Sequence, residues 1–186
     1  MTQLIHPAAI VESTAVGHGT RIWAFAHVLR GAIVGENCNI CDHTFIEGDV
    51  VLGDRVTVKC GVYLWDGTRV EDDAFIGPAV VFTNDLRPRS KQYKAPVRTL
   101  ISRGASLGAG SVVLAGVTIG AHGMTGIGSV VTRDVPAHAL VYGNPARFQG
   151  WVDEEGNDLA ADIPGRWRSV GGTVYGETPA GLARVG

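Results

Sequence analysis

A branched aliphatic residue recurs at every sixth position over the first part of the chain. A second series with the same period runs from Ile101 to Val131, interrupted by Thr125. A small or β-branched residue stands two positions before most of these aliphatics, and glycine often follows them. An α-helix repeats at about 3.6 residues and a single alternating strand at about two, so neither explains this period. The first series comprises Ile10, Val16, Ile22, Val28, Val34, Ile40, Ile46, Leu52, Val58, Leu64, Val70 and Ile76.

The period has a direct structural meaning. Residues two apart in an extended strand point to the same side, so each small residue and the aliphatic after it face inward together. Between such pairs the chain must turn a corner, and residues that tolerate unusual backbone angles, such as Gly, Asp and Asn, occupy those places. Strands and corners that alternate at a fixed spacing wind a solenoid with one continuous core. We therefore expect an all-β parallel helix, whose handedness the spacing does not determine.

Composition and charge exclude several classes of protein. The 186 residues are 45% hydrophobic, and the 26 glycines fall in phase with the repeat, which is typical of repeat architecture. The formal net charge of −2 gives no electrostatic basis for binding nucleic acid or an anionic membrane. No basic segment leads into an apolar run near the first residues, so we expect no signal peptide, no membrane span and a cytoplasmic location.

The repeat is interrupted once. Phe82 and Ile101 are nineteen residues apart, and the segment between them carries two prolines, three arginines and two lysines. Such residues cannot line an apolar core, so we expect residues 83–100 to leave the solenoid as an external loop. Loops on rigid scaffolds commonly carry function. A tolerated surface insertion is the alternative, and the concentration of positive charge, which a phosphorylated ligand would need, favours function.

Proline ends the repeat after Val131. Pro136 follows the last aliphatic step, so we expect the solenoid domain to span residues 1–136 and a C-terminal extension to span residues 137–186. Two short alternating runs flank a Gly-Gly pair at 171–172, and this pattern predicts a β-hairpin. The sequence indicates no function for the extension.

The three cysteines do not predict a metal site. Cys38 and Cys41 have the spacing of a zinc ligand pair, and His43 follows them, but the chain has no second pair of ligands. Cys38 also falls in an inward small-residue place, where core packing explains it. We expect no metal.

Three stretches stand out beside the period, namely Arg21–His27, Val81–Asn84 with Pro88–Ser90, and Val131–Pro136 with Gly143–Arg147. With the period they resemble the hexapeptide-repeat acyltransferases, which are left-handed parallel β-helices and work as trimers with sites between subunits. The closer resemblance is to the sugar-nucleotide N-acetyltransferases, and it covers about residues 4–152.

Three further strings narrow the resemblance, namely Cys41–Glu47, Lys59–Val62 with Leu64–Gly67, and Thr83–Asp85. They are similar to the enzymes that acetylate the 3-amino group of dTDP-linked 3-amino-3,6-dideoxyhexoses. The related UDP-2-acetamido-3-amino-glucuronate acetyltransferases share the framework and tend to differ after Asn84. The resemblance implies an acetyl-CoA-dependent N-acetyltransferase that acts on a nucleotide-linked amino sugar, without naming the hexose epimer.

The resemblance also implies roles for individual residues. Asn84 is the expected catalytic residue. Arg89 is expected at the diphosphate, and Trp65 is expected at an exposed corner, as a subunit contact or a platform for a sugar or base. The residues expected at the substrate are Glu47, Trp65, Asp66, Asp85 and Arg89, and those expected at acetyl-CoA are Gly108, Gly126, Arg133 and Arg147.

One segment departs from the family's pattern. Thr125 puts a hydroxyl at a core step, and Ile127 adds bulk where the pantetheine arm of the cofactor is expected to run. Segment 121–128 therefore leaves open whether the acyl group is acetyl.

The residue at the loop indicates which nucleophile is acylated. O-acetyltransferases on this fold use a histidine there, because a sugar hydroxyl is too weak an acid to attack a thioester unaided. Here the place is held by Asn84. A neutral amine is already nucleophilic, so an asparagine that positions it and polarises the carbonyl suffices, and the departing sulfur can take the proton. An asparagine that only satisfies backbone groups of a turn is the alternative.

Three other functions compete with this one. An O-acetyltransferase lacks support because the loop has no histidine at residue 84. A γ-class carbonic anhydrase on the same fold needs three clustered histidine ligands, which this chain lacks. A catalytically idle solenoid, acting as scaffold or partner subunit, is supported only by the irregular segment 121–128.

Overall fold

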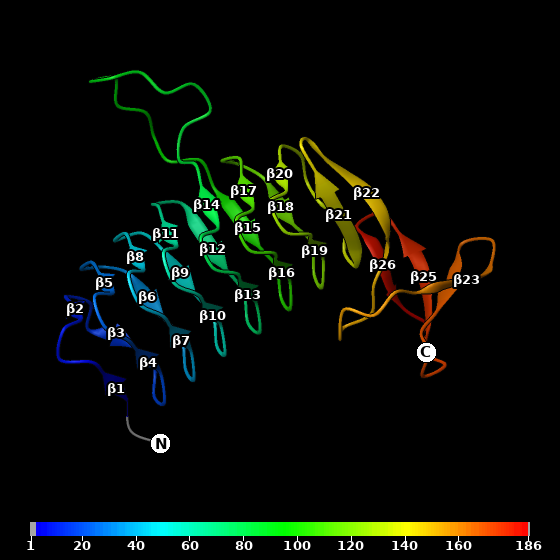
Figure 1. Ribbon diagram of the computed structural model, residues 1–186, viewed down its shortest axis with the longest axis horizontal. Coiled ribbons are helices and arrows are strands. Elements are labelled where there is room, and N and C mark those ends of the chain that lie inside the picture. The colour runs from blue at the N-terminus through cyan, green and yellow to red at the C-terminus, as the bar shows by residue number, and fades with distance from the viewer. Residues whose placement is uncertain (1–2, 186) are drawn as a thin grey trace.

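The protein is an elongated prism of short parallel strands, closed at one end by an antiparallel sheet (Figure 1). The computed structural model describes residues 3–185, and within that range 26 strands and no helix are present. Three stacked sheets, here A, B and C, form the walls of the prism. The expected all-β fold is confirmed, and the three-walled prism is the architecture of the left-handed parallel β-helix.

Each turn of the chain contributes one strand to each wall. Sheet A contains β1 (Leu4–Ile5), β4 (Arg21–Ile22), β7 (Asn39–Ile40), β10 (Thr57–Val58), β13 (Phe75–Ile76), β16 (Ser106–Leu107), β19 (Met124–Thr125), β21 (Ala139–Gly143) and β22 (Ala146–Trp151). Sheet B contains β2 (Ile10–Val11), β5 (His27–Val28), β8 (Phe45–Ile46), β11 (Tyr63–Leu64), β14 (Val81–Phe82), β17 (Val112–Val113) and β20 (Val130–Val131). Sheet C contains β3 (Ala15–Val16), β6 (Ile33–Val34), β9 (Val51–Leu52), β12 (Thr68–Val70), β15 (Thr99–Ile101) and β18 (Thr118–Ile119).

The aliphatic repeat forms the core, as the period predicts. From Ile22 onward every step of both series is buried, and Phe82 is only 3% exposed. Thr125 is also fully buried, and its hydroxyl is satisfied by the backbone N–H of Gly108 at 3.0 Å and the hydroxyl of Ser111 at 3.1 Å. The hydroxyl at this core step therefore does not leave an unpaired polar group.

The first coil differs from the prediction. Val11 pairs with Val28, whereas Ile10 pairs with His27 and is 57% exposed. Ile10 was expected as the first inward step, and this is wrong because the first coil is one residue shorter than those that follow. A shift of one residue turns a side chain to the opposite face of a strand, so Val11 takes the inward place.

The loop leaves the prism between sheets B and C. The chain departs after β14 and returns at β15, and the segment between them projects well clear of the coils (Figure 1). Thr99 begins β15 and is buried, so the excursion spans residues 83–98. The expected extruded loop is confirmed.

The C-terminal part continues the prism and then caps it. Strand β21 stacks in parallel on β19 and turns back into β22, so sheet A extends past residue 136. The last strands form the antiparallel sheet D, in which β24 and β25 pair across Gly171 and Gly172. A domain division at residue 136 stays a prediction. Sheet D consists of β23 (Ala160–Ile163), β24 (Arg166–Arg168), β25 (Val174–Thr178) and β26 (Gly181–Arg184).

Candidate active site

One corner of the prism collects polar residues from three successive coils. The corner between sheets B and C follows β8, β11 and β14, and it carries Glu47, Asp66 and Asn84 in turn. Because parallel coils stack in register, residues that follow the same wall lie above one another. Residues that are about 18 positions apart in the sequence therefore lie near one another along one edge of the prism.

The two carboxylates at this corner tie adjacent coils together. Glu47 Oε2 accepts a hydrogen bond from the backbone N–H of Asp66 at 2.7 Å, and Asp66 Oδ1 accepts one from the backbone N–H of Asp49 at 2.8 Å. Each carboxylate therefore uses one oxygen within the structure. A carboxylate has about four acceptor sites, so each retains capacity for a ligand.

An open pocket of about 320 Å³ lies between this corner and the loop. Five of the six residues predicted for catalysis and substrate binding line it together: Glu47, Asp66, Asn84, Asp85 and Arg89. The remaining lining residues are Pro88, Gln92, Tyr93, Lys94 and Pro96, which the sequence reasoning did not single out. Their only signal in the sequence was their place in a charged loop.

Asn84 presents a free amide to the pocket. The residue is exposed, and within residues 3–185 its side chain makes no hydrogen bond. The preceding residue anchors it, because Thr83 Oγ1 accepts the backbone N–H of Ala115 at 2.9 Å. Among the described residues, the Asn84 side chain therefore lacks the hydrogen bonds to the backbone that an asparagine with only a turn-forming role would make.

Asp85 is held in place by the loop itself. Its Oδ1 accepts the backbone N–H of Arg87 at 2.7 Å and the Lys94 ammonium at 3.1 Å. The hydrogen bond from the backbone of Arg87 lowers the pKa of the Asp85 carboxyl, and Lys94 adds to this effect. Asp85 is therefore an anion at neutral pH.

Trp65 differs from the expectation of an exposed platform. It is half-buried, packs against the core, and donates its indole Nε1–H to the backbone oxygen of Phe82 at 2.7 Å. Its ring lies 5.9 Å from that of Phe45 and 6.1 Å from that of Tyr63. Trp65 does not line the loop pocket, and its contacts support the wall beneath the loop.

The four residues predicted for the cofactor fall into two groups. Arg133 and Arg147 are exposed and line a second pocket of about 500 Å³, beside Phe148 and Trp151. Gly108 and Gly126 follow strands of sheet A, so they stack at the corner between sheets A and B. The structure of one chain does not bring the two groups together.

The stacked glycines have a packing explanation. A Cβ on Gly108 would lie 2.6 Å from the carbonyl oxygen of Thr125 and 2.7 Å from the carbonyl carbon of Gly126. Only glycine allows the coils to approach this closely. Ile127 next to them is 82% exposed, so its side chain adds bulk outside the prism, along this corner.

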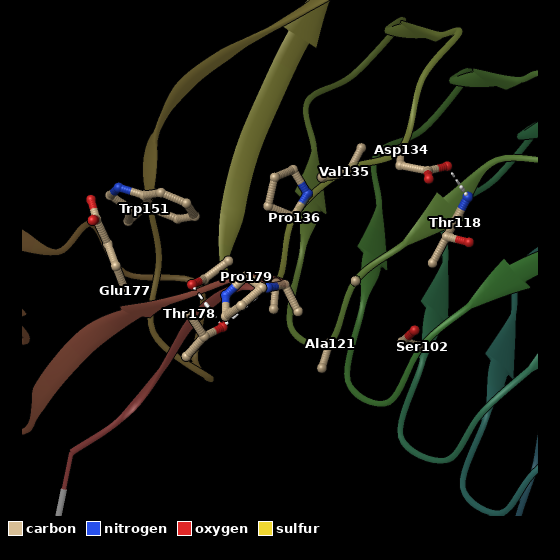
Figure 2. A pocket seen from close by; sticks show the side chains of 14 residues that line it. Ser102, Thr118, Ala121, Asp134, Val135, Pro136, Trp151, Glu177, Thr178 and Pro179 are labelled. Atoms are coloured by element: carbon tan, nitrogen blue, oxygen red, sulfur yellow. Dashed lines mark hydrogen bonds between the residues drawn. The ribbon is translucent and has the colours of Figure 1, made fainter. Parts of the chain in front are cut away.

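A larger pocket lies where sheet D meets the end of the prism. It has a volume of about 670 Å³, and Figure 2 shows Trp151 and Glu177 on one side and Asp134 and Thr118 on the other. Asp134 Oδ1 accepts the backbone N–H of Thr118 at 2.8 Å. The sequence carried no signal for this pocket, because it depends on how the C-terminal sheet packs.

The described residues contain neither a cluster of metal ligands nor a membrane-spanning helix. No group of three or more His, Cys, Asp or Glu side chains is arranged to hold a metal ion within residues 3–185. The same part of the chain has no helix of sufficient length and hydropathy to cross a membrane.

Comparison with known proteins identifies the framework. The family described as bacterial transferase hexapeptide (six repeats) matches residues 13–48. The dTDP-3-amino-3,6-dideoxy-alpha-D-galactopyranose 3-N-acetyltransferase of Aneurinibacillus thermoaerophilus is 59% identical over 152 residues, which cover 81% of this chain and 79% of that protein. The chain belongs to the hexapeptide-repeat sugar-nucleotide N-acetyltransferases.

Two more distant proteins share the framework of this N-acetyltransferase. The perosamine N-acetyltransferase from Caulobacter crescentus, solved with CoA and GDP-perosamine, superimposes with a TM-score of 0.52 and 26% identity, covering 81% of this chain and 57% of that one. Serine acetyltransferase 4 of Arabidopsis thaliana is 35% identical over 81% of this chain, which spans only 30% of that protein. The framework is thus common to enzymes with different acceptors. The acceptor of this chain must therefore be inferred from the residues of its loop.

Proposed function

We propose that the chain transfers the acetyl group of acetyl-CoA to the 3-amino group of dTDP-3-amino-3,6-dideoxygalactose. The relative that is 59% identical is named for this reaction. The structural observation that carries the proposal is the loop pocket, where the free amide of Asn84 lies among the carboxylates of Glu47, Asp66 and Asp85. Such a pocket offers acceptors for an amine and for sugar hydroxyls, and it contains no histidine.

The reaction needs no strong base. The neutral amine attacks the thioester carbonyl, the N–C bond forms, and the C–S bond breaks as the tetrahedral intermediate collapses. The proton lost by the nitrogen passes to the departing thiolate, which leaves an amide and CoA. Asn84 orients the amine or donates to the carbonyl oxygen, and a preorganised dipole of this kind stabilises the charge that develops there.

The remaining residues of the pocket bind the nucleotide sugar. We assign the unused acceptor sites of Glu47 and Asp66 to sugar hydroxyls. The Asp85 carboxylate, kept ionised by Arg87 and Lys94, favours an ammonium or hydroxyl donor nearby. Arg89 is exposed at the rim of the pocket, where its guanidinium suits the diphosphate.

The cofactor residues support a site shared between subunits. Arg133 and Arg147 line one pocket, and we assign their guanidinium groups to the phosphates of acetyl-CoA. Gly108 and Gly126 stand at the corner on the opposite side of sheet B from the loop. If sheet B faces the partner subunits of a trimer, the loop corner of one subunit meets the glycine corner of the next, and both groups of residues serve one cofactor.

The outer face of sheet B has the composition of such an interface. Its outward residues align in register from coil to coil and are nearly all apolar or aromatic, and Tyr63 and Val81 are about half exposed in the isolated chain. Exposed apolar patches of this extent mark protein contacts. The stripe consists of Ile10, His27, Phe45, Tyr63, Val81, Val112 and Val130. We therefore propose a homotrimer, located in the cytoplasm, where acetyl-CoA and nucleotide sugars are available.

The test is a panel of acceptors assayed for CoA release. With acetyl-CoA present, we expect rapid release with dTDP-3-amino-3,6-dideoxygalactose and slower release with its 4-epimer. Release with UDP-2-acetamido-3-amino-glucuronate in preference to both would assign the chain to that related group.

Calorimetric titration with acetyl-CoA separates the enzyme from an idle solenoid. We expect saturable binding with one site per chain, since every chain supplies one copy of each residue group. Absence of binding, together with absence of CoA release from every acceptor, would identify the chain as a scaffold or partner subunit.

A further inference from the structure

One lysine ties together the two halves of the extruded loop. The Lys94 ammonium lies 3.1 Å from Asp85 Oδ1 and also donates to the backbone oxygen of Arg87. Lys94 belongs to the half of the loop that returns to the prism, whereas Asp85 and Arg87 belong to the half that leaves it. Their contact closes a segment that is otherwise long and exposed.

The other polar contacts of the loop are local. Arg89 Nη1 donates to the backbone oxygen of the adjacent Pro88, and the backbone N–H of Gln92 donates to the backbone oxygen of Arg89. Within residues 3–185, no other side-chain hydrogen bond joins the two halves of the segment 83–98. The contacts of Lys94 are therefore the side-chain hydrogen bonds that hold the two halves of the loop together.

This tie lies directly beside the catalytic candidate. Asn84 is the neighbour of Asp85, and both line two pockets, of about 320 and 280 Å³, in the loop. Lys94 lines both pockets as well. The Lys94 ammonium and the backbone N–H of Arg87 both donate to Oδ1 of Asp85, so the carboxylate next to Asn84 is restrained by two partners.

We propose that Lys94 is a positioning residue of the acetyltransferase: by pairing with Asp85 it holds Asn84 in the orientation that the transfer requires. Hydrogen bonds between charged groups are about twice as strong as those between neutral ones, which makes this pair a suitable clamp. The clamp is partly screened, because the Lys94 side chain is 45% exposed and that of Asp85 19%. The kinetic half of the inference rests on the proposed function.

Limited proteolysis tests the clamp without any assay of activity. Trypsin can cut after Arg89 in the native loop, and Lys94→Met should make this cut about tenfold faster, because loss of a charge-assisted bond raises the open population. The matched control is Lys91→Met, which removes the same charge and one tryptic site from the same loop. Equal rates in Lys94→Met and Lys91→Met, as followed by mass spectrometry, would overturn the inference.

Steady-state kinetics then test positioning. Lys94→Met should lower kcat about tenfold while leaving both KM values within about twofold, and Lys94→Arg should recover part of the loss. The double variant with Asp85→Asn should be no slower than Asp85→Asn alone, because the two residues act as one unit. A tenfold rise in the KM of the nucleotide sugar at unchanged kcat would show that Lys94 contacts the diphosphate directly, and would contradict the inference. If the wild-type chain releases no CoA, the proposed function fails, and the proteolysis result still decides whether the clamp exists.

Discussion

Asn84 combines exposure with a fixed backbone, which is what a group that contacts a reacting substrate requires. Its amide has no hydrogen bond within residues 3–185, while Thr83 before it and Asp85 after it are both anchored. The backbone at Asn84 is therefore positioned by its two neighbours, while the amide itself stays free to bond to a substrate. The polar contacts at this part of the loop are made by the neighbours of Asn84 and not by Asn84 itself.

Asn84→Ala tests this role. We expect kcat to fall by roughly 10²–10³, the usual cost of losing one preorganised donor. The circular dichroism spectrum and the thermal midpoint should stay those of the wild type, because the side chain lies outside the core. Full turnover in the variant, with an unchanged fold, would reduce Asn84 to a turn residue.

Arg133→Ala should have the opposite signature. Arg133 lines the pocket that it shares with Arg147 and is not among the residues that line the loop pocket. We expect the KM and the calorimetric Kd for acetyl-CoA to rise about tenfold, with kcat at saturation little changed. A fall in kcat at unchanged Kd would place Arg133 at the chemical step instead.

At the scale of residues, sequence reasoning finds those that share a corner and misses those that depend on loop conformation. Glu47, Asp66 and Asn84 follow successive strands of one wall, so the period alone brings them to one edge. Lys94 reaches Asp85 only because the loop folds back, which no period describes. Trp65 is expected at an exposed corner as a subunit contact or ligand platform, whereas its indole donates to the backbone oxygen of Phe82.

At the scale of elements, the junction between the prism and sheet D depends on a stacked pair of histidines. The His122 ring lies 5.0 Å from that of His138, and the His138 ring lies 5.2 Å from that of Tyr175 in β25. His122 Nδ1 is buried without a hydrogen-bond partner among the described residues. Burial lowers the pKa of His122, and the neighbouring His138 lowers it further.

This depressed pKa predicts how stability depends on pH. Because the unfolded chain binds a proton to His122 more readily than the folded chain does, stability from this group is present above the unfolded pKa of about 6.5 and is lost as the pH falls below it. Glu154 and Asp73 oppose the shift, and Arg184 adds to it. We expect the thermal midpoint to drop between pH 7.5 and pH 5.

The variant His122→Phe isolates this contribution. Phe25 already stacks on His43 at 5.0 Å in a comparable corner with positive φ, so a phenyl ring fits such a place. The decrease of the midpoint on acidification should be smaller in His122→Phe than in the wild type, whereas the exposed control His18→Phe should keep the wild-type slope. Identical slopes in all three proteins, measured by scanning calorimetry, would exclude His122 as the source.

The elements themselves were largely predictable, and the exceptions have physical causes. From Ile22 to Val131 every residue of the six-residue series is buried, because facing the interior of the prism is how these strands remove their aliphatic side chains from water. The first coil departs from the pattern because it is one residue shorter than the coils that follow, so Val11 takes the inward place and Ile10 faces outward. Sheet D has no six-residue period, so only its Gly171–Gly172 hairpin left a local signal.

At the scale of the whole molecule, sheet B has the most continuous apolar outer face of the three walls, and we propose that partner subunits cover it. The outward residues of sheet B are apolar or aromatic except for His27, whereas sheet A carries Arg21, Asn39 and Thr57 in the equivalent places and sheet C carries Arg69 and Thr118. In the trimer that we propose, covering sheet B would also bring the loop corner and the glycine corner of different subunits together. Oligomeric state and activity are therefore linked in this account.

Light scattering at micromolar concentration should give the mass of a trimer. Tyr63 is 49% exposed at the centre of the sheet B stripe, so Tyr63→Lys should weaken the trimer and reduce activity with it, because a charge there would be buried against a partner. Thr57→Lys, on the outer face of sheet A, is the matched control and should remain trimeric. A wild-type chain that is monomeric under these conditions would contradict the shared site.

The most direct test of N-acetyl transfer uses two acceptors that differ in a single functional group. The chain is incubated with acetyl-CoA and either dTDP-3-amino-3,6-dideoxygalactose or the matching sugar nucleotide with a hydroxyl at carbon 3, and CoA release is followed with time. Because the loop pocket offers the amide of Asn84 and no histidine base, we predict rapid CoA release and an N-acetylated product with the amine only. Equal release with the amine and the hydroxyl would contradict the assignment.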